Sequence, residues 1–285
     1  MEEIGGWHTR PRLLKLTFGV TMSTLATYLQ ISNNLPKWQK MTASQPNVTQ
    51  QTKYYQENIG KVKTPADLVG NFKLFSYVLN AYGLGDQVYA KSLFRKVLEQ
   101  GTGSTKTLAY TLNDPRILAL AKTFNFKASG ASTTSSSAVK TDVVNNYVEQ
   151  TLETTQGQSN QGVQLALYFQ RNAPNIKTAY NILADKNLLT VVQTALGISP
   201  LTAAMNVDRQ ATMISNKLNI NDFQDPKKLA TFIQKFSVLY DANNAGATTP
   251  QSTLTPNAVV NLSNIGANFS VNLLSNIQSL KLGGF

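Results

Sequence analysis

Apolar side chains recur at steps of three and four residues along most of this 285-residue chain, which is the spacing of amphipathic α-helices. One such run follows Asn71 and is expected to direct five side chains inward: Phe72, Phe75, Val78, Leu79 and Tyr82. Alternation of apolar and polar residues with a period of two, which would indicate strands, is absent from the sequence. The pattern therefore predicts an all-α protein.

Several expected helices begin and end with residues that favour helix termini. The segment 64–67 (TPAD) places Thr at the cap, Pro at the first helical position and Asp three residues after the cap. The pairs at 114–115 and 225–226 are both Asp-Pro, and each is expected to open a further helix. Gly83 and Gly197 follow two apolar runs and are expected to end them.

One part of this pattern occurs twice in the chain. Residues 54–64 read YYQENIGKVKT, and residues 168–178 read YFQRNAPNIKT. The register then continues without a gap as far as Leu84 in the first copy and Ile198 in the second. Because such self-similarity is typical of a duplicated structural unit, two related helical lobes are expected.

Changes in composition divide the chain into six expected parts. In chain order these are an upstream extension (1–21), a first helical lobe (22–126), a flexible linker (127–141), a second helical lobe (142–240), a loose linker (241–258) and a C-terminal amphipathic helix (259–285). The extension is expected because the helical pattern begins just after Met22. The first linker is expected because its residues are small and polar, a composition typical of flexible segments.

The C-terminal segment combines a regular apolar stripe with an uncharged polar face. Its apolar residues are Leu262, Ile265, Phe269, Leu273, Ile277 and Leu280, and these are the candidate partner-binding residues. Lys281 is the only charged residue between positions 255 and 285. A helix of this kind is better suited to packing against protein than to standing alone in water. Docking on its own chain and docking on a partner both remain open.

Composition argues against enzyme chemistry. The chain has no cysteine, its single histidine is His8, and its 15 carboxylates show neither clustering nor metal-ligand spacing. We therefore expect a protein that is not an enzyme, with no catalytic, cofactor-binding or metal-binding residues and no small-molecule substrate. No apolar run approaches the roughly 18 residues that a transmembrane helix requires.

The formal net charge is +11, and from Lys37 to Lys235 the Lys and Arg residues are scattered singly except for pairs at 95–96 and 227–228, without forming a stripe or an arm. Nucleic-acid-binding proteins usually concentrate such charge, so nucleic-acid binding is only a minor alternative. Five tyrosines could form a stacking platform for single strands, but their helical spacing is more typical of core packing. They are Tyr54, Tyr55, Tyr77, Tyr82 and Tyr89.

The order of motifs resembles that of DUF1217, a family of alphaproteobacterial proteins. The resemblance rests on residues 54–84, on YAKSLFRKVLEQG and LNDPR in the first half, and on GVQLALYFQRNAP and DPKKLATFIQKF in the second half. It covers about Ser23 to Tyr240. The resemblance implies an all-helical fold and a role associated with the flagellum, because the genes of this family tend to sit among flagellar genes. It implies no catalytic residues.

These observations lead to an expected function in protein–protein interaction. The chain is expected to be a structural or accessory component of the bacterial flagellum, in the basal body or periplasm, that binds rod, hook or export-apparatus proteins, with self-association left open. The alternative is a cytoplasmic export chaperone or regulator that holds a partner's helix in the groove between the two lobes.

Overall fold

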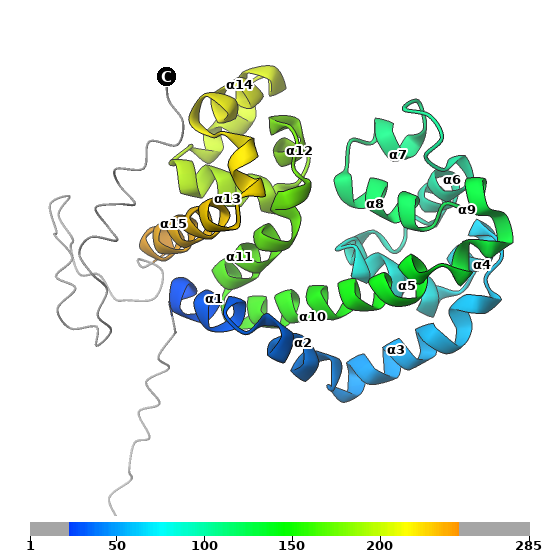
Figure 1. Ribbon diagram of the computed structural model, residues 1–285. Coiled ribbons are helices and arrows are strands. Elements are labelled where there is room, and N and C mark those ends of the chain that lie inside the picture. Colours follow the sequence, from blue (N-terminus) through cyan, green and yellow to red (C-terminus); the bar gives the residue numbers. More distant parts are fainter. Residues whose placement is uncertain (1–22, 245–285) are drawn as a thin grey trace, which may run out of the picture.

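The computed structural model describes residues 23–244, and this part of the chain is helical and contains no β-strand (Figure 1). The predicted all-α fold is therefore confirmed. The α-helices are α1 (Thr24–Ser32), α2 (Leu35–Ala43), α3 (Pro46–Asn58), α4 (Pro65–Gly70), α5 (Phe72–Ala81), α6 (Lys91–Gln100), α7 (Leu108–Thr111), α8 (Pro115–Thr123), α9 (Phe126–Ser129), α10 (Val143–Ser159), α11 (Gln161–Asn172), α12 (Ala179–Leu183), α13 (Lys186–Leu196), α14 (Val207–Lys217) and α15 (Pro226–Asn244). Short helical turns join them: η1 (Ile59–Lys61), η2 (Gly85–Gln87), η3 (Gly130–Ser135), the π-helical η4 (Ala138–Asp142), η5 (Ala173–Asn175), η6 (Pro200–Ala204) and η7 (Ile220–Gln224).

The helices enclose two separate hydrophobic cores, which define two lobes. The first lobe is built on residues from Tyr55 to Val143, with Phe75 and Phe94 among its fully buried side chains. The second lobe is built mainly on α11 to α15, with Phe169 and Phe236 at its centre. The long helix α10 runs from the first lobe to the second, with Val143 in the first core and Leu152 in the second (Figure 1).

The N-terminal helix α1 belongs to the second lobe, although it precedes the first in sequence. Tyr28 and Ile31 are buried in the core of the second lobe, where α1 packs against α11 and α15 (Figure 1). The Thr24 amide also donates to the carboxylate of Asp241 at 2.9 Å. The expected first lobe began at residue 22, whereas the core of the first lobe takes up the chain only from α3. Sequence order alone does not reveal such a crossing.

The segment expected to be a flexible linker is folded. Residues 126–142 form α9, η3 and η4, and Val139 is completely buried in the core of the first lobe. The buried Tyr55 hydroxyl donates to the Val139 carbonyl at 2.7 Å, and the buried Thr134 hydroxyl donates to the Val62 carbonyl at 3.0 Å. Small hydroxyl side chains can satisfy nearby backbone groups as well as solvent, which explains why composition alone indicated a loop.

The predicted helix ends agree with the structure at the positions that carry a cap. Thr64 forms a capping box with Asp67, and Thr178 forms the same box with Asn181. Gly83 and Gly197 take the left-handed backbone, with φ of 68° and 62°. One detail of the predicted inward face is wrong: Phe72 stands at the first position of α5 and is 51% exposed.

The two copies of the repeated pattern have the same local hydrogen bonds. The side-chain carboxamide of Asn58 donates to the Tyr54 backbone carbonyl, and that of Asn172 donates to the Tyr168 backbone carbonyl, both at 2.8 Å. The ammonium groups of Lys63 and Lys177 each donate to a backbone carbonyl three residues earlier. The residues that the copies share are therefore those that make the same local contacts, while descent from a duplication stays a prediction.

Candidate functional site

A cleft of about 750 Å³ lies between the two lobes, and we call it the interlobe cleft. It is lined by residues of α7 and α8 from the first lobe and of α11, η5 and α12 from the second. In Figure 1, α7 and α8 lie opposite α12, above α10. Its polar lining includes Tyr110, Asn113 and Lys122 from the first lobe, Asn172, Asn175, Lys177 and Asn181 from the second, and Asn146 from α10. Its volume is within the range of about 300–1,000 Å³ typical of ligand sites.

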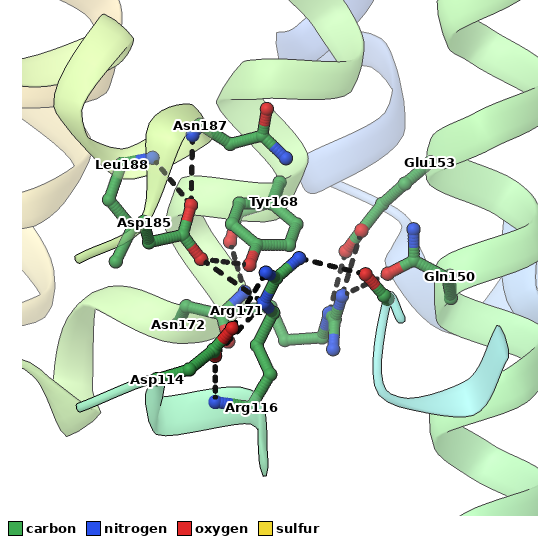
Figure 2. A network of polar contacts seen from close by, with 11 residues as sticks. Asp114, Arg116, Gln150, Glu153, Tyr168, Arg171, Asn172, Asp185, Asn187 and Leu188 are labelled. Atoms are coloured by element: carbon green, nitrogen blue, oxygen red, sulfur yellow. Dashed lines mark hydrogen bonds and ion pairs between the residues drawn. The ribbon is translucent and has the colours of Figure 1, made fainter. Parts of the chain in front are cut away.

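Arg116 joins the two lobes at the base of the interlobe cleft. Its guanidinium donates to both oxygens of Asp114, at 3.1 and 2.8 Å, and to the Gly83 carbonyl at 2.9 Å (Figure 2). The same guanidinium lies 3.8 Å from the Asp185 carboxylate of the second lobe. Burial lowers the pKa of Arg116, but the hydrogen bonds and charge of Asp114 outweigh it and raise that pKa. The group therefore stays charged and acts as a link between the lobes.

Asp185 is the second-lobe partner in this link. It is almost fully buried, and one carboxylate oxygen caps α13 by accepting from the amides of Asn187 and Leu188, at 2.8 and 3.1 Å. The other oxygen accepts from the Tyr168 hydroxyl at 2.5 Å (Figure 2). Burial and the neighbouring Asp185 charge raise the pKa of Tyr168, so its hydroxyl keeps the donated proton.

A second ion-pair network lies beside the first, around Arg171. Its guanidinium donates to both carboxylate oxygens of Glu153, at 2.7 and 2.9 Å, and to Gln150 at 2.6 Å (Figure 2). The same guanidinium stands over the Tyr168 ring, 5.4 Å from its centroid. Burial raises the pKa of Glu153, while the charge and hydrogen bonds of Arg171 oppose that rise. The pair connects α10 to α11.

The cleft therefore presents two kinds of groups to a ligand. At its base, Arg116 and Arg171 are already matched with carboxylates, so their charges are committed to the fold. On its walls, the exposed Lys122 and Lys177 and several carboxamides face the open space. Carboxamides both donate and accept hydrogen bonds, and lysines attract carboxylates. This arrangement is suited to binding a polar polypeptide segment.

The residues singled out from the sequence lie in different places in the structure. Tyr55, Tyr77 and Tyr82 are buried in the core of the first lobe, as core packing predicted, whereas Tyr89 is 87% exposed. The six candidate partner-binding residues of the C-terminal segment lie outside the described residues, as do residues 1–21. Within residues 23–244 no group of three or more His, Asp or Glu side chains could hold a metal ion.

The sequence reasoning missed the side chains that join the lobes. Arg116 followed a recognised Asp-Pro helix start, but nothing local indicated that it would reach the other lobe. Asp185 could have been found, because it stands where the first copy of the repeat has Asn71. Where matched positions of the two copies differ in charge, as Asn71 and Asp185 do, the charged residue is a candidate for a contact that only its own copy makes.

None of the helices within residues 23–244 has the length and apolar character needed to cross a membrane.

The chain was compared with known protein families, curated sequences and solved structures. The family model described as "Protein of unknown function (DUF1217)" matches residues 81–229. The crystal structure of protein AGR_C_984 from Agrobacterium tumefaciens is similar to this chain, with 39% sequence identity and a TM-score of 0.73. That similarity covers 78% of this chain and 94% of the other. No curated protein sequence shows significant similarity to this chain.

Proposed function

We propose that this chain, which belongs to the DUF1217 family of proteins of unknown function, is a non-enzymatic accessory component of the bacterial flagellum that binds protein partners in the interlobe cleft. The observation that carries the proposal is the construction of this cleft. Both lobes contribute walls, and the ion pair between Arg116 and Asp185 joins one wall to the other. Preformed sites of this kind bind with a small conformational cost.

The chemistry of the walls favours a polypeptide as the ligand. Asn113, Asn146 and Asn175 line the cleft, and carboxamides can pair with the backbone groups of an extended or helical segment. Lys122 and Lys177 on opposite walls would attract acidic side chains of that segment. Partner binding is therefore expected to weaken with salt, because the two lysines are exposed.

The flagellar part of the proposal rests on the family resemblance and on composition. Genes of the family tend to sit among flagellar genes, and the chain shares with rod and hook proteins the lack of cysteine and an abundance of Asn, Gln, Ser and Thr. Under this proposal the protein acts in the basal body or periplasm, with rod, hook or export-apparatus proteins as partners.

A second candidate function is a cytoplasmic export chaperone or regulator that holds a partner's helix. The apolar side chains of Tyr180 and Val207, exposed beside the cleft, favour it, since helix-in-groove recognition uses apolar anchors. Localisation separates the two candidates. Cofractionation with purified basal bodies supports the first, and a purely soluble cytoplasmic pool supports the second.

The direct test is capture of flagellar proteins from flagellated cells with the tagged full-length chain, followed by mass spectrometry. Asn175→Trp fills part of the cleft and is expected to abolish capture. Asn34→Trp is the matched control, because Asn34 is exposed, makes no side-chain cap bond and lies away from the cleft. Equal capture by both variants would contradict binding in the cleft. Capture that also survives deletion of residues 259–285 would exclude the C-terminal segment as the partner-binding element.

A further inference from the structure

A second cavity, of about 360 Å³, lies between α2, α10 and α11, and we call it the leucine-walled cavity. It is lined by Leu35 from α2, by Glu149, Leu152 and Glu153 from α10, and by Leu167, Gln170 and Arg171 from α11. Arg171 also lines the interlobe cleft, but the other six residues do not. The leucine-walled cavity is therefore a separate space, and its volume is within the range typical of small-ligand sites.

The charged groups that line this cavity do not balance. The Arg171 guanidinium is matched with Glu153, because it donates to both carboxylate oxygens at 2.7 and 2.9 Å (Figure 2). Glu149 is the second carboxylate. One of its oxygens accepts from the Gln39 carboxamide at 2.6 Å, and the other lies 3.9 Å from Nε of Arg171, which is too long for a hydrogen bond. Two carboxylates and one guanidinium leave one negative charge in the lining without a cation of its own.

Gln170 brings an unsatisfied acceptor to the same cavity. Its side-chain oxygen Oε1 is the one buried side-chain nitrogen or oxygen within residues 23–244 that has no hydrogen-bond partner. Buried polar atoms are nearly always hydrogen-bonded, and an unpaired one costs free energy. A carboxamide oxygen can only accept a hydrogen bond. A ligand that offers an N–H group to Gln170 would therefore recover that cost.

The three leucine side chains decide between the kinds of cation that the cavity could hold. Leu152 and Leu167 are buried, and Leu35 is partly buried against the core of the second lobe. A hard metal ion such as Ca²⁺ or Mg²⁺ needs about six or more oxygen ligands, and leucine side chains supply none. An organic cation can place its charged head beside a carboxylate while its hydrocarbon stem covers apolar surface. The lining therefore favours an aliphatic amine over a metal ion.

We propose that the leucine-walled cavity binds one alkylammonium group, whose N–H groups donate to Glu149 and Gln170 and whose stem packs against the three leucines. The single charge of this group matches the single unmatched carboxylate. Its head has three N–H donors, whereas a guanidinium has five, which is more than these two acceptors can satisfy. A lysine side chain of a bound protein and a free short amine both carry the group. The site is distinct from the interlobe cleft and does not depend on the flagellar role.

A titration of the purified full-length chain, followed by the nuclear magnetic resonance of its leucine methyl groups, tests the proposal. The probe is n-butylammonium chloride at constant ionic strength, and n-butanol is the neutral control with the same stem. The methyl signals of Leu35, Leu152 and Leu167 should shift saturably with n-butylammonium, with a Kd on the order of millimolar for so small a ligand. n-Butanol should cause no saturable shift. Equal responses to the two compounds would overturn the proposal, as would no saturable response to n-butylammonium.

Removing the unmatched charge should weaken binding most. Glu149→Gln should raise the Kd at least ~10-fold, because a hydrogen bond to a charged group is lost. The fold should remain, since a carboxamide oxygen at position 149 can still accept from Gln39. Glu57→Gln is the matched control, because Glu57 is exposed on α3 and pairs with Lys53. Equal Kd values for these two variants would contradict the role of Glu149.

Removing the unsatisfied acceptor separates a binding role from a structural one. Gln170→Leu should raise the Kd about 5-fold, the usual effect of one lost hydrogen bond. It should not lower the free energy of unfolding in urea titrations, because Oε1 of Gln170 makes no hydrogen bond within residues 23–244. A variant that loses stability and keeps its affinity for n-butylammonium would show that Gln170 supports the fold and not the ligand.

Two further probes distinguish the sources of the amine. Nα-acetyl-lysine methylamide presents a lysine side chain between neutral backbone groups, and 1,4-diaminobutane is a free diamine. Tighter binding of the lysine derivative assigns the site to a lysine of a protein partner, whereas tighter binding of the diamine assigns it to a free amine. Binding of neither would overturn the proposal. These titrations contain no flagellar protein, so their outcome is independent of capture in the interlobe cleft.

Discussion

The same pair of residues occurs in both lobes and has a different role in each. Tyr54 shares hydrogen bonds of 3.4 and 3.2 Å with Asn71, the cap of α5, and Lys73 stands over its ring. Tyr168 is buried and donates to Asp185, the cap of α13, at 2.5 Å, and Arg171 stands over its ring. Both pairs lie between a helix and the cap of a later one, so the local architecture is the same.

The two pairs differ by one negative charge, on Asp185, and by the ion-pair contact that this charge makes. Asn71 and Tyr54 form a neutral pair at the half-exposed surface of the first lobe. Asp185 carries a carboxylate, and Arg116 of the other lobe lies 3.8 Å from it. A buried carboxylate requires a partner of opposite charge, whereas a neutral amide is satisfied by hydrogen bonds alone. One substitution in a repeated motif thereby converts a local cap into a contact between lobes.

The largest effect on stability is expected at the position where the two copies carry side chains of opposite charge. Arg171 and Glu57 occupy the same position of the repeat, but Arg171 forms the buried pair with Glu153 and Glu57 forms an exposed pair with Lys53. Arg171→Ala leaves Glu153 buried without a partner and should lower the free energy of unfolding by about 3–5 kcal/mol in urea titrations. Glu57→Ala should cause no measurable change, because exposed pairs contribute little. Similar losses in both variants would show that the buried pair is not special.

Replacing each cap residue by the one at the matched position of the other copy should change stability by intermediate and unequal amounts. Asp185→Asn keeps a residue that can cap α13 but removes the charge that faces Arg116 and Tyr168. It should lower the free energy of unfolding by about 1.5–3 kcal/mol, the usual value for hydrogen bonds to charged groups. Asn71→Asp also preserves a cap and should be close to neutral, since no arginine faces it. Urea denaturation followed by circular dichroism measures both variants, and equal effects would remove the proposed asymmetry.

The smallest effect is expected for a tyrosine of the first lobe, and it depends on pH. Burial raises the pKa of Tyr82 to about 12, although its hydrogen bond to Thr123 opposes that rise. The unfolded chain therefore releases this proton from about pH 10 upward while the folded chain keeps it, so stability present below pH 10 is lost as pH rises toward 12. Tyr82→Phe should cost about 1 kcal/mol at pH 7 and should reduce this alkaline loss. Urea titrations at pH 8 and 11 measure the change, and an unchanged alkaline loss would contradict it.

Much of the local structure could be predicted from the sequence. The capping box at Thr64, the left-handed Gly83 and Gly197 and the Asp-Pro start of α8 all follow from backbone preferences and bonds within a few residues. The folded segment 126–142 could not be predicted in the same way. Its hydroxyl side chains suit a loop and a packed turn equally well, and only the contacts of Thr134 and Val139 with distant residues distinguish the two.

The candidate site shows the same division. The walls of the interlobe cleft come from helices whose starts were visible in sequence. The cleft itself depends on the placement of the two lobes, which are connected by α10 and joined by the ion pair between Arg116 and Asp185. α1 adds a contact of the same kind, since it crosses from the chain's start to the second lobe. Contacts between residues far apart in sequence carry no signal in the spacing of either partner.

The sequence by itself determined the helical class, the helix ends and the repeated unit of this protein. These depend on side-chain periodicity, on φ preferences and on hydrogen bonds that close within one turn, and such forces act wherever the residues occur. Only the tertiary structure decided which copy of each repeated residue is buried and which charges meet. The physical reason is that burial and the cost of an unpaired charge depend on what packs across from a residue, and Asp185 faces Arg116 only after both lobes have folded.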